Sequence, residues 1–178
     1  FLEGAPVKVV TSHEYLGVLI RSDGKVTPSM SKRLGEATAA FNKLRPVWNN
    51  PALPKSKKIK IFKTVFIPKA LYALHHSWLT AAQVSSLDSW YIKLLRRVLS
   101  IKHAYWSHTS NQKVLDKANL PPISLLLQQR QLTYYGHVLR ADPNDPIRTC
   151  TYNDFLCERT FYTKRRVGRP REKWAPNL

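Results

Sequence analysis

Hydrophobic residues recur with the period of an α-helix near the start of the chain, and this pattern restricts the fold more than any other feature. Between residues 30 and 48, successive apolar positions are separated by 4, 3, 4, 3 and 4 residues. Such spacing places all of them on one face of a helix, which must be buried against another element. Thr27 and Pro28 are typical of a helix start, and Asn49-Asn50-Pro51 is typical of a helix end. The stripe consists of Met30, Leu34, Ala37, Phe41, Leu44 and Trp48.

Two more helices are predicted in the middle of the chain. One begins near Pro54, and Pro68 should kink or break it, because a proline inside a helix removes a hydrogen bond and clashes with the preceding turn. The next begins at Thr80-Ala81-Ala82-Gln83, which has the pattern of a capping box. The apolar faces of these two helices are Ile59, Phe62, Val65, Phe66, Leu71 and Leu74 in the first, and Val84, Leu87, Tyr91, Leu94 and Val98 in the second.

The two ends of the chain predict different structure. The β-branched and aromatic residues of segments 7–10 and 15–20 favour the two strands of a hairpin, with a turn after it at Ser22-Asp23-Gly24. A short helix is expected around residues 114–115, and a longer one over residues 123–139. The expected fold is therefore mainly α, with a β-hairpin at 1–26, a helical bundle at 27–141 and an extended basic tail at 142–178.

The chain carries far more positive than negative charge. It has 29 Lys and Arg against 11 Asp and Glu over 178 residues, which is a net charge of +18. An excess of this size repels itself unless an anion lies against it, so nucleic acid is the first predicted partner and an anionic membrane surface the second. The 43% of hydrophobic residues is enough for a core and excludes a wholly disordered chain. No run of about 18 apolar residues occurs, so a spanning helix is not expected.

Much of the positive charge lies in a stretch that lacks acidic residues. No Asp or Glu occurs between Glu36 and Asp88. Within this stretch, Lys57, Lys60 and Lys63 repeat every three positions, opposite the apolar face of their helix. Such an array can follow a phosphate backbone, and a solvated lysine face is the alternative interpretation. The candidate nucleic-acid-binding residues are Lys55, Lys57, Lys58, Lys60, Lys63 and Lys69, then Lys93, Arg96 and Arg97, whose stems could instead cover apolar surface.

The C-terminal tail holds the densest cluster of cations. Its centre, Val167-Gly168-Arg169-Pro170, combines a glycine that allows close backbone approach with a proline that keeps the chain extended. Such a segment suits a narrow minor groove or an RNA crevice. The neighbouring aromatic rings could stack on unpaired bases or, alternatively, dock the tail on the body. The cations are Lys164, Arg165, Arg166, Arg169, Arg171 and Lys173, and the aromatic residues are Tyr152, Phe155, Phe161, Tyr162 and Trp174.

No catalytic site, metal site or cofactor is predicted. The 11 acidic residues are scattered, whereas two-metal phosphoryl transfer needs carboxylates that converge. Asp142 and Asp145 flank prolines at a helix end, where a turn role is expected. The histidines are interpreted as structural groups or phosphate contacts, including His75-His76, expected on different faces of a helix, and the pair that brackets an aromatic loop at 103–108. Two cysteines, Cys150-x₆-Cys157, leave a zinc site with a histidine as the alternative.

Short sequence blocks occur in order along nearly the whole chain. The first are Tyr15-Leu16-Gly17-Val18-Leu19-Ile20, Ser22-Asp23-Gly24, Ser31-Lys32-Arg33-Leu34-Gly35-Glu36-Ala37 and Ala40-Phe41-Asn42-Lys43-Leu44. The later ones are Pro68-Lys69-Ala70-Leu71-Tyr72, Leu94-Leu95-Arg96-Arg97-Val98-Leu99, Arg130-Gln131-Leu132, Tyr135-Gly136-His137-Val138-Leu139-Arg140 and Gly168-Arg169-Pro170-Arg171-Glu172-Lys173-Trp174. Together they resemble the region after the polymerase palm in reverse transcriptases of non-LTR (LINE-type) retrotransposons.

This resemblance implies a primer grip followed by a thumb that cradles a template–primer duplex. Tyr15, Leu16 and Gly17 match the grip, and the basic residues of the second and third helices would face the duplex backbone. The family's catalytic aspartates, including the paired Asp-Asp of the palm, have no counterpart in this sequence. Polymerase activity is therefore not expected, and the chain is predicted not to be an enzyme.

The sequence leaves a choice of three functions. The first is a domesticated retroelement remnant that binds structured or A-form RNA, such as ribosomal RNA, next to other proteins of a ribonucleoprotein. Its expected location is intracellular, for example in a mitochondrial ribosome. The second is a fragment of an active LINE-type reverse transcriptase that holds an RNA–DNA hybrid. The third, a basic module for a membrane surface or a protein partner, is disfavoured because the apolar faces resemble core faces in several helices at once.

Overall fold

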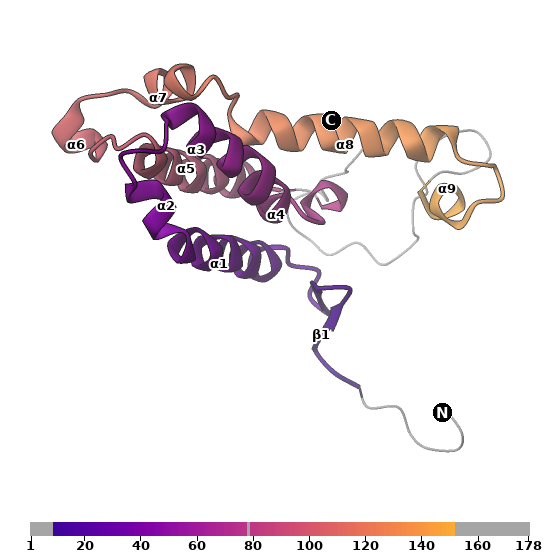
Figure 1. The fold of residues 1–178 in the computed structure, drawn as a ribbon. Helices are drawn as coiled ribbons and strands as arrows, with labels where there is room; N and C mark the ends of the chain where they lie inside the picture. The colour runs from indigo at the N-terminus through magenta and orange to yellow at the C-terminus, as the bar shows by residue number, and fades with distance from the viewer. Residues whose placement is uncertain (1–8, 78, 152–178) are drawn as a thin grey trace.

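The computed structural model describes residues 9–77 and 79–151, which form mainly helices preceded by a two-stranded antiparallel hairpin (Figure 1). This confirms the predicted fold class. The strands are β1 (Ser12–Tyr15) and β2 (Val18–Arg21). The helical elements are α1 (Thr27–Lys43), α2 (Arg45–Asn49), α3 (Lys55–Ile61), the π-helical η1 (Phe62–Phe66), α4 (Ile67–Ala70), the 3-10 helix η2 (Leu74–His76), α5 (Ala81–Val98), α6 (Ala104–Ser107), α7 (Asn111–Ala118), α8 (Ile123–Arg140) and α9 (Pro146–Thr151).

The predicted first helix is divided in two at Leu44. α1 ends at Lys43, and α2 follows with Pro46 in its first turn. A proline has no amide hydrogen and its ring collides with the carbonyl four positions earlier, so α1 cannot continue through this position. The apolar stripe nevertheless survives the break, because the rings of Phe41 and Trp48 stack with their centroids 4.8 Å apart.

The basic segment at residues 55–70 is a continuous helix, α3–η1–α4, with a π-helical turn in its middle. Pro68 was predicted to kink or break this helix, and it does not break it. Instead, the wider turn of η1 precedes this proline, which lies in the first turn of α4. A wider turn moves the side chains around the helix axis. Val65, predicted in the core, is consequently 44% exposed, whereas Phe62 and Phe66 are fully buried.

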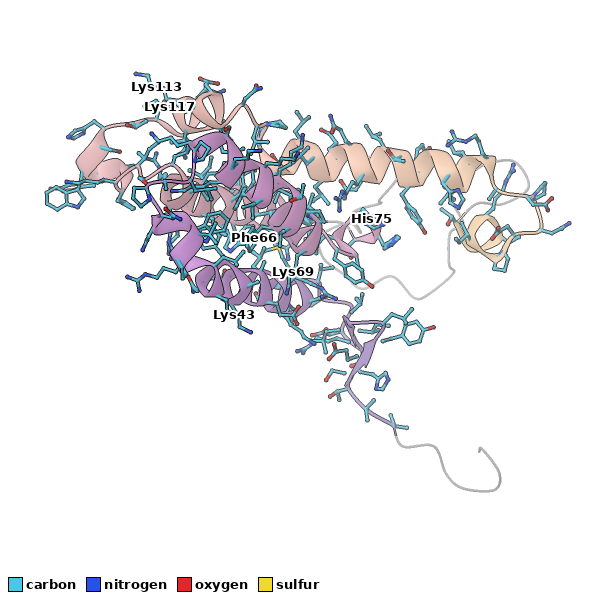
Figure 2. The ribbon with its side chains drawn as sticks, in the orientation of Figure 1. Lys43, Phe66, Lys69, His75, Lys113 and Lys117 are labelled. Carbon is cyan, nitrogen blue, oxygen red and sulfur yellow. The ribbon has the colours of Figure 1, made fainter. Side chains whose placement is uncertain are left out.

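An aromatic cluster forms the centre of the core between α1, α2, the α3–η1–α4 helix and α5. The ring centroid of Phe66 lies 5.4 Å from that of Phe41 and 5.7 Å from that of Trp48. Phe62 joins α5 to this cluster, since its ring lies 5.6 Å from that of Tyr91. Figure 2 shows Phe66 inside the bundle. Because protein interiors pack as densely as crystals, this cluster holds the basic helix in a fixed orientation.

The predicted capping box at the start of α5 is confirmed. Thr80 Oγ1 accepts a hydrogen bond from the Gln83 amide at 3.4 Å, and Gln83 Oε1 accepts one from the Thr80 amide at 2.7 Å. The N-cap predicted at Thr27 is wrong. Val26 occupies that position in α1 without a side-chain bond, and Thr27 Oγ1 accepts a hydrogen bond from Gln83 Nε2 at 2.8 Å. Gln83 therefore joins the first turns of α1 and α5.

The helix α8 packs on α5 and extends beyond the rest of the bundle, where α9 lies beside its end (Figure 1). Asp88 of α5 accepts a hydrogen bond from the Ser124 amide at 3.0 Å, which satisfies a free donor in the first turn of α8. The tail predicted to be extended from residue 142 contains α9. The carboxylate of Asp145 accepts a hydrogen bond from an amide in the first turn of α9 at 2.9 Å, so this part of the tail is helical.

The hairpin turns at Leu16-Gly17, inside the segment that was predicted to be a single strand. Tyr15 pairs with Val18, and the two residues between them have φ angles of 47° and 76°. Positive φ at both positions gives the two-residue turn that matches the twist of paired strands, and glycine tolerates it. The predicted strand 15–20 is therefore divided between the end of β1, the turn and β2. Of the predicted strand 7–10, residues 9 and 10 precede β1, and residues 7 and 8 lie outside the described residues.

Candidate nucleic-acid interface

The exposed lysines of the α3–η1–α4 helix form the strongest candidate interface. Phe62 and Phe66 hold one side of this helix in the aromatic core. The exposed side chains of this helix include five lysines. We refer to the exposed cations of this helix as the lysine face, and they are Lys55, Lys57, Lys60, Lys63 and Lys69.

Within the part of the chain that the structure describes, no ion pair joins the lysine face to a carboxylate. Glu14, Asp23 and Glu36 pair with cations of the hairpin and of α1. The other carboxylates of this part accept hydrogen bonds from amide groups, and they are Asp88, Asp116, Asp142 and Asp145. The turn role predicted for Asp142 and Asp145 is thereby confirmed. The positive charge of the lysine face is thus available to an external anion.

Lys58 was predicted to contact nucleic acid, and the structure corrects this prediction. Its exposed fraction is only 6%, and its ammonium donates a hydrogen bond to the Trp48 carbonyl at 2.7 Å. Trp48 in turn donates from Nε1 to the Phe41 carbonyl at 2.8 Å. A cation at the carbonyl end of a helix is favoured by the helix dipole. Lys58 therefore ties α3 to the end of α2 and has no surface for a phosphate.

The three cations predicted on α5 have different environments. Lys93 is exposed. Arg96 is 6% exposed, and its guanidinium donates to the Thr109 carbonyl at 2.6 Å and to Asn111 Oδ1 at 3.1 Å. Arg96 is therefore a structural residue, which corrects its predicted role in binding. Arg97 is exposed, and its guanidinium carbon lies 4.7 Å from the centroid of an aromatic ring of α1.

The residues that resemble a primer grip lie at the hairpin turn, which is docked on the bundle through its backbone. The Leu16 carbonyl accepts a hydrogen bond from Tyr72 Oη at 3.1 Å, and the Gly17 carbonyl accepts one from the Arg33 guanidinium. Arg33 also lies over the ring of Tyr72, 4.5 Å from its centroid. The side chains of Tyr15 and Leu16 are 61% and 72% exposed. The turn is thus anchored by its carbonyls and presents its side chains to solvent.

The predicted cluster in the tail lies outside the described residues, so its role stays a prediction. The same holds for the aromatic residues around it and for Cys157. The cations concerned are Lys164, Arg165, Arg166, Arg169, Arg171 and Lys173.

The histidine pair His75-His76 was predicted to point to different faces of a helix, and this is wrong. Their rings pack together in η2 with centroids 3.8 Å apart, and both lie against Tyr134 of α8 (Figure 2 labels His75). Burial lowers the pKa of both imidazoles, and the charges of His76 and Arg130 lower the pKa of His75 further. The pair is therefore a packing contact between η2 and α8 that favours neutral rings.

Residues 9–77 and 79–151 offer neither a metal site nor a membrane-spanning helix. No group of three or more His, Cys, Asp or Glu side chains in these ranges converges into a set that could hold a metal ion. None of the helices in these ranges combines the length and the apolar character needed to cross a bilayer.

Several exposed residues were not part of the predicted site. Lys43 lies at the end of α1, and Lys113 and Lys117 lie on α7 (Figure 2). The aromatic residues Tyr105 and Trp106 of α6 are 73% and 72% exposed. The sequence held one signal for this pair, because two large rings occur next to each other between His103 and His108 without a place in any helical apolar stripe.

No family model, curated protein or solved structure matches the chain. The resemblance to LINE-type reverse transcriptases therefore stays a hypothesis that depends on the sequence blocks alone. The function has to be argued from the geometry and the charge of the described residues.

Proposed function

We propose that this protein binds the phosphate backbone of structured RNA through the lysine face and carries out no chemistry on it. The observation that supports the proposal is a set of five exposed lysines without carboxylate partners among the described residues, on a helix that Phe62 and Phe66 anchor in an aromatic core. Because the helix is already ordered by folding, little backbone entropy is lost when a phosphate backbone binds to it.

An A-form duplex is the partner that fits this arrangement best. Proteins recognise such duplexes mainly by their shape and by phosphate and 2′-hydroxyl positions, because the deep major groove is closed to side chains. The lysine face supplies backbone contacts of this type through its exposed ammonium groups. It supplies no side chain with the paired donors and acceptors that read a base edge. The binding proposed here is therefore sensitive to the form of the duplex and insensitive to its sequence.

The biological setting is proposed from the sequence blocks that resemble LINE-type reverse transcriptases. The first setting is a domesticated remnant that binds ribosomal or other structured RNA beside neighbouring proteins of a ribonucleoprotein, for example in a mitochondrion. The second is a piece of an active reverse transcriptase that holds an RNA–DNA hybrid, with Tyr15 at the primer grip. The docked hairpin turn supports the second setting, since it presents Tyr15 and Leu16 to solvent next to the bundle.

A pair of matched variants tests the lysine face. K57Q/K60Q removes two exposed cations from α3, and K113Q/K117Q removes two exposed cations from α7 (Figure 2). Gln and Lys have similar helix propensities, so both variants should keep their helical circular dichroism. Binding of the full chain to an RNA duplex is measured by fluorescence anisotropy over a series of salt concentrations.

The expected result is a difference in salt dependence. Each phosphate contact contributes about −0.9 to the slope of log K against log salt, so K57Q/K60Q should flatten this slope by roughly 2, while K113Q/K117Q leaves it nearly unchanged. Equal slopes for the two variants would show that general charge, and not the lysine face, drives binding. An RNA–DNA hybrid and vesicles of anionic lipid are measured in parallel, and tighter binding to vesicles than to either duplex contradicts the proposal.

A further inference from the structure

Two aromatic rings project from α6, which forms one end of the described structure (Figure 1). Tyr105 and Trp106 are 73% and 72% exposed, and their rings meet edge to face with centroids 5.1 Å apart. Large aromatic side chains are mostly buried in folded proteins. Two adjacent exposed aromatic side chains therefore indicate a surface that a ligand covers.

The loop that carries these rings is held in place from inside the protein. The buried guanidinium of Arg96 donates hydrogen bonds to Lys102, Ser107, Thr109 and Asn111, at 3.4, 3.4, 2.6 and 3.1 Å. Lys102 precedes α6 in the sequence, Ser107 is its last residue, and Thr109 and Asn111 follow it. One fixed side chain therefore orders the loop before any ligand binds, which reduces the entropy lost on binding.

A basic pocket opens beside the first residue of α6. Its volume is about 530 Å³, within the range of pockets that hold small ligands. Lys93, Arg97 and His103 contribute polar groups to its wall, and Ile92 and Ile101 contribute apolar ones. His103 Nδ1 accepts a hydrogen bond from the Tyr105 amide at 3.4 Å, which leaves Nε2 as the ring nitrogen that can contact a ligand.

We infer that this end of the molecule binds an unpaired nucleotide of the RNA, with its base stacked on the Tyr105-Trp106 pair and its phosphate in the basic pocket. The inference depends on the proposed function and adds to it, since the lysine face would hold a duplex and α6 a single-stranded extension. Aromatic faces stack on any base, and nearby cations attract its phosphate. A protein partner fits less well, because the wall formed by Lys93, Arg97 and His103 favours an anion.

The test compares two RNA ligands that differ only in an overhang. One is a blunt duplex, and the other carries a short single-stranded oligoadenylate at one end. The full chain and the variant Y105A/W106A are titrated against both. Y105F/W106F keeps the aromatic faces and should keep the preference for the overhang. L125A/L132A removes exposed apolar side chains from α8 and controls for a general loss of surface.

The unmodified chain should bind the overhang ligand at least about tenfold more tightly than the blunt duplex, which corresponds to about 1.4 kcal/mol and to stacking of one base. Y105A/W106A should lose this preference while its affinity for the blunt duplex stays the same. The inference is overturned if the unmodified chain shows no preference, if Y105A/W106A keeps it, or if that variant weakens both ligands equally. A chain that binds neither RNA refutes the proposed function as well, whereas salt-sensitive binding of the blunt duplex without overhang preference refutes only the inference.

Discussion

Replacing Arg96 by Met removes the side chain that orders the α6 loop while keeping most of its apolar stem. The buried guanidinium makes two short hydrogen bonds, to Thr109 at 2.6 Å and to Asn111 at 3.1 Å, and two longer ones at 3.4 Å. The loop at residues 102–111 should therefore open more often in R96M, while the aromatic core stays intact.

The size of the effect follows from which acceptor loses its partner. Asn111 is exposed, so its amide oxygen can bond to water after the substitution. The Thr109 carbonyl is half-buried and loses a charged donor, which costs about 1–3 kcal/mol. Removal of the buried charge offsets part of this loss. A net destabilisation of the loop by about 2 kcal/mol corresponds to a roughly 30-fold larger open fraction.

Hydrogen exchange of the full chain measures this opening directly. The amides of Trp106, Ser107 and His108 donate within the loop, to carbonyls at 3.0, 3.0 and 2.9 Å, so their exchange reports on its order. R97M serves as the matched control, because it makes the same substitution at the next residue. Arg97 donates to Asn42 of α1 at 3.0 Å and makes no hydrogen bond to the loop among the described residues.

The expected result is exchange roughly 30-fold faster at these three amides in R96M, with protection near that of the unmodified chain in R97M. Equal exchange in the two variants would refute the assignment of Arg96 as the residue that orders the loop. Faster exchange across all helices of R96M would also refute it, because the residue would then support the whole core.

The remaining predictions concern stability. F66A should lower the free energy of unfolding by about 3–5 kcal/mol in urea titrations, because Phe66 is fully buried. V65A is the control and should change this free energy little, because Val65 is 44% exposed. Similar losses in the two variants would contradict the described core. His75 and His76 have pKa values lowered below the ordinary 6.5, so between the folded pKa and 6.5 the unfolded chain binds more protons. The protein should therefore lose stability as the pH falls below about 6.5, and H75Q/H76Q should reduce this loss, while an unchanged pH profile in thermal melts would exclude the pair as its source.

Local patterns in the sequence were sufficient for the elements whose signals lie within a few residues. The capping box Thr80–Gln83 is an example, because both partners belong to one helical turn. The stripe of residues 30–48 likewise predicted which helix face is buried. Periodicity identifies this face but does not identify the element that packs against it. The break at Pro46 was missed because the stripe continues on the far side of it.

The structure separates the predicted cations of α3–η1–α4 and α5 into exposed and buried side chains. Five lysines of the α3–η1–α4 helix are exposed as expected, but Lys58 and Arg96 are buried. Each is held by backbone carbonyls that are distant in the sequence, 10 residues away for Lys58 and 13 for Arg96. Helical periodicity relates residues three or four positions apart and does not indicate partners at these distances. The sequence alone therefore could not show which cations are exposed and which are buried.

By itself, the order of residues determined that the chain is helical, strongly cationic and equipped with a short hairpin, because these properties depend on nearby residues and on sums over the chain. Only the tertiary structure decided which cations meet solvent, how Pro68 is accommodated by a π-helical turn, and where the Tyr105-Trp106 pair is presented. These outcomes depend on long-range packing, because the burial of a side chain is set by contacts with elements that are distant in the sequence.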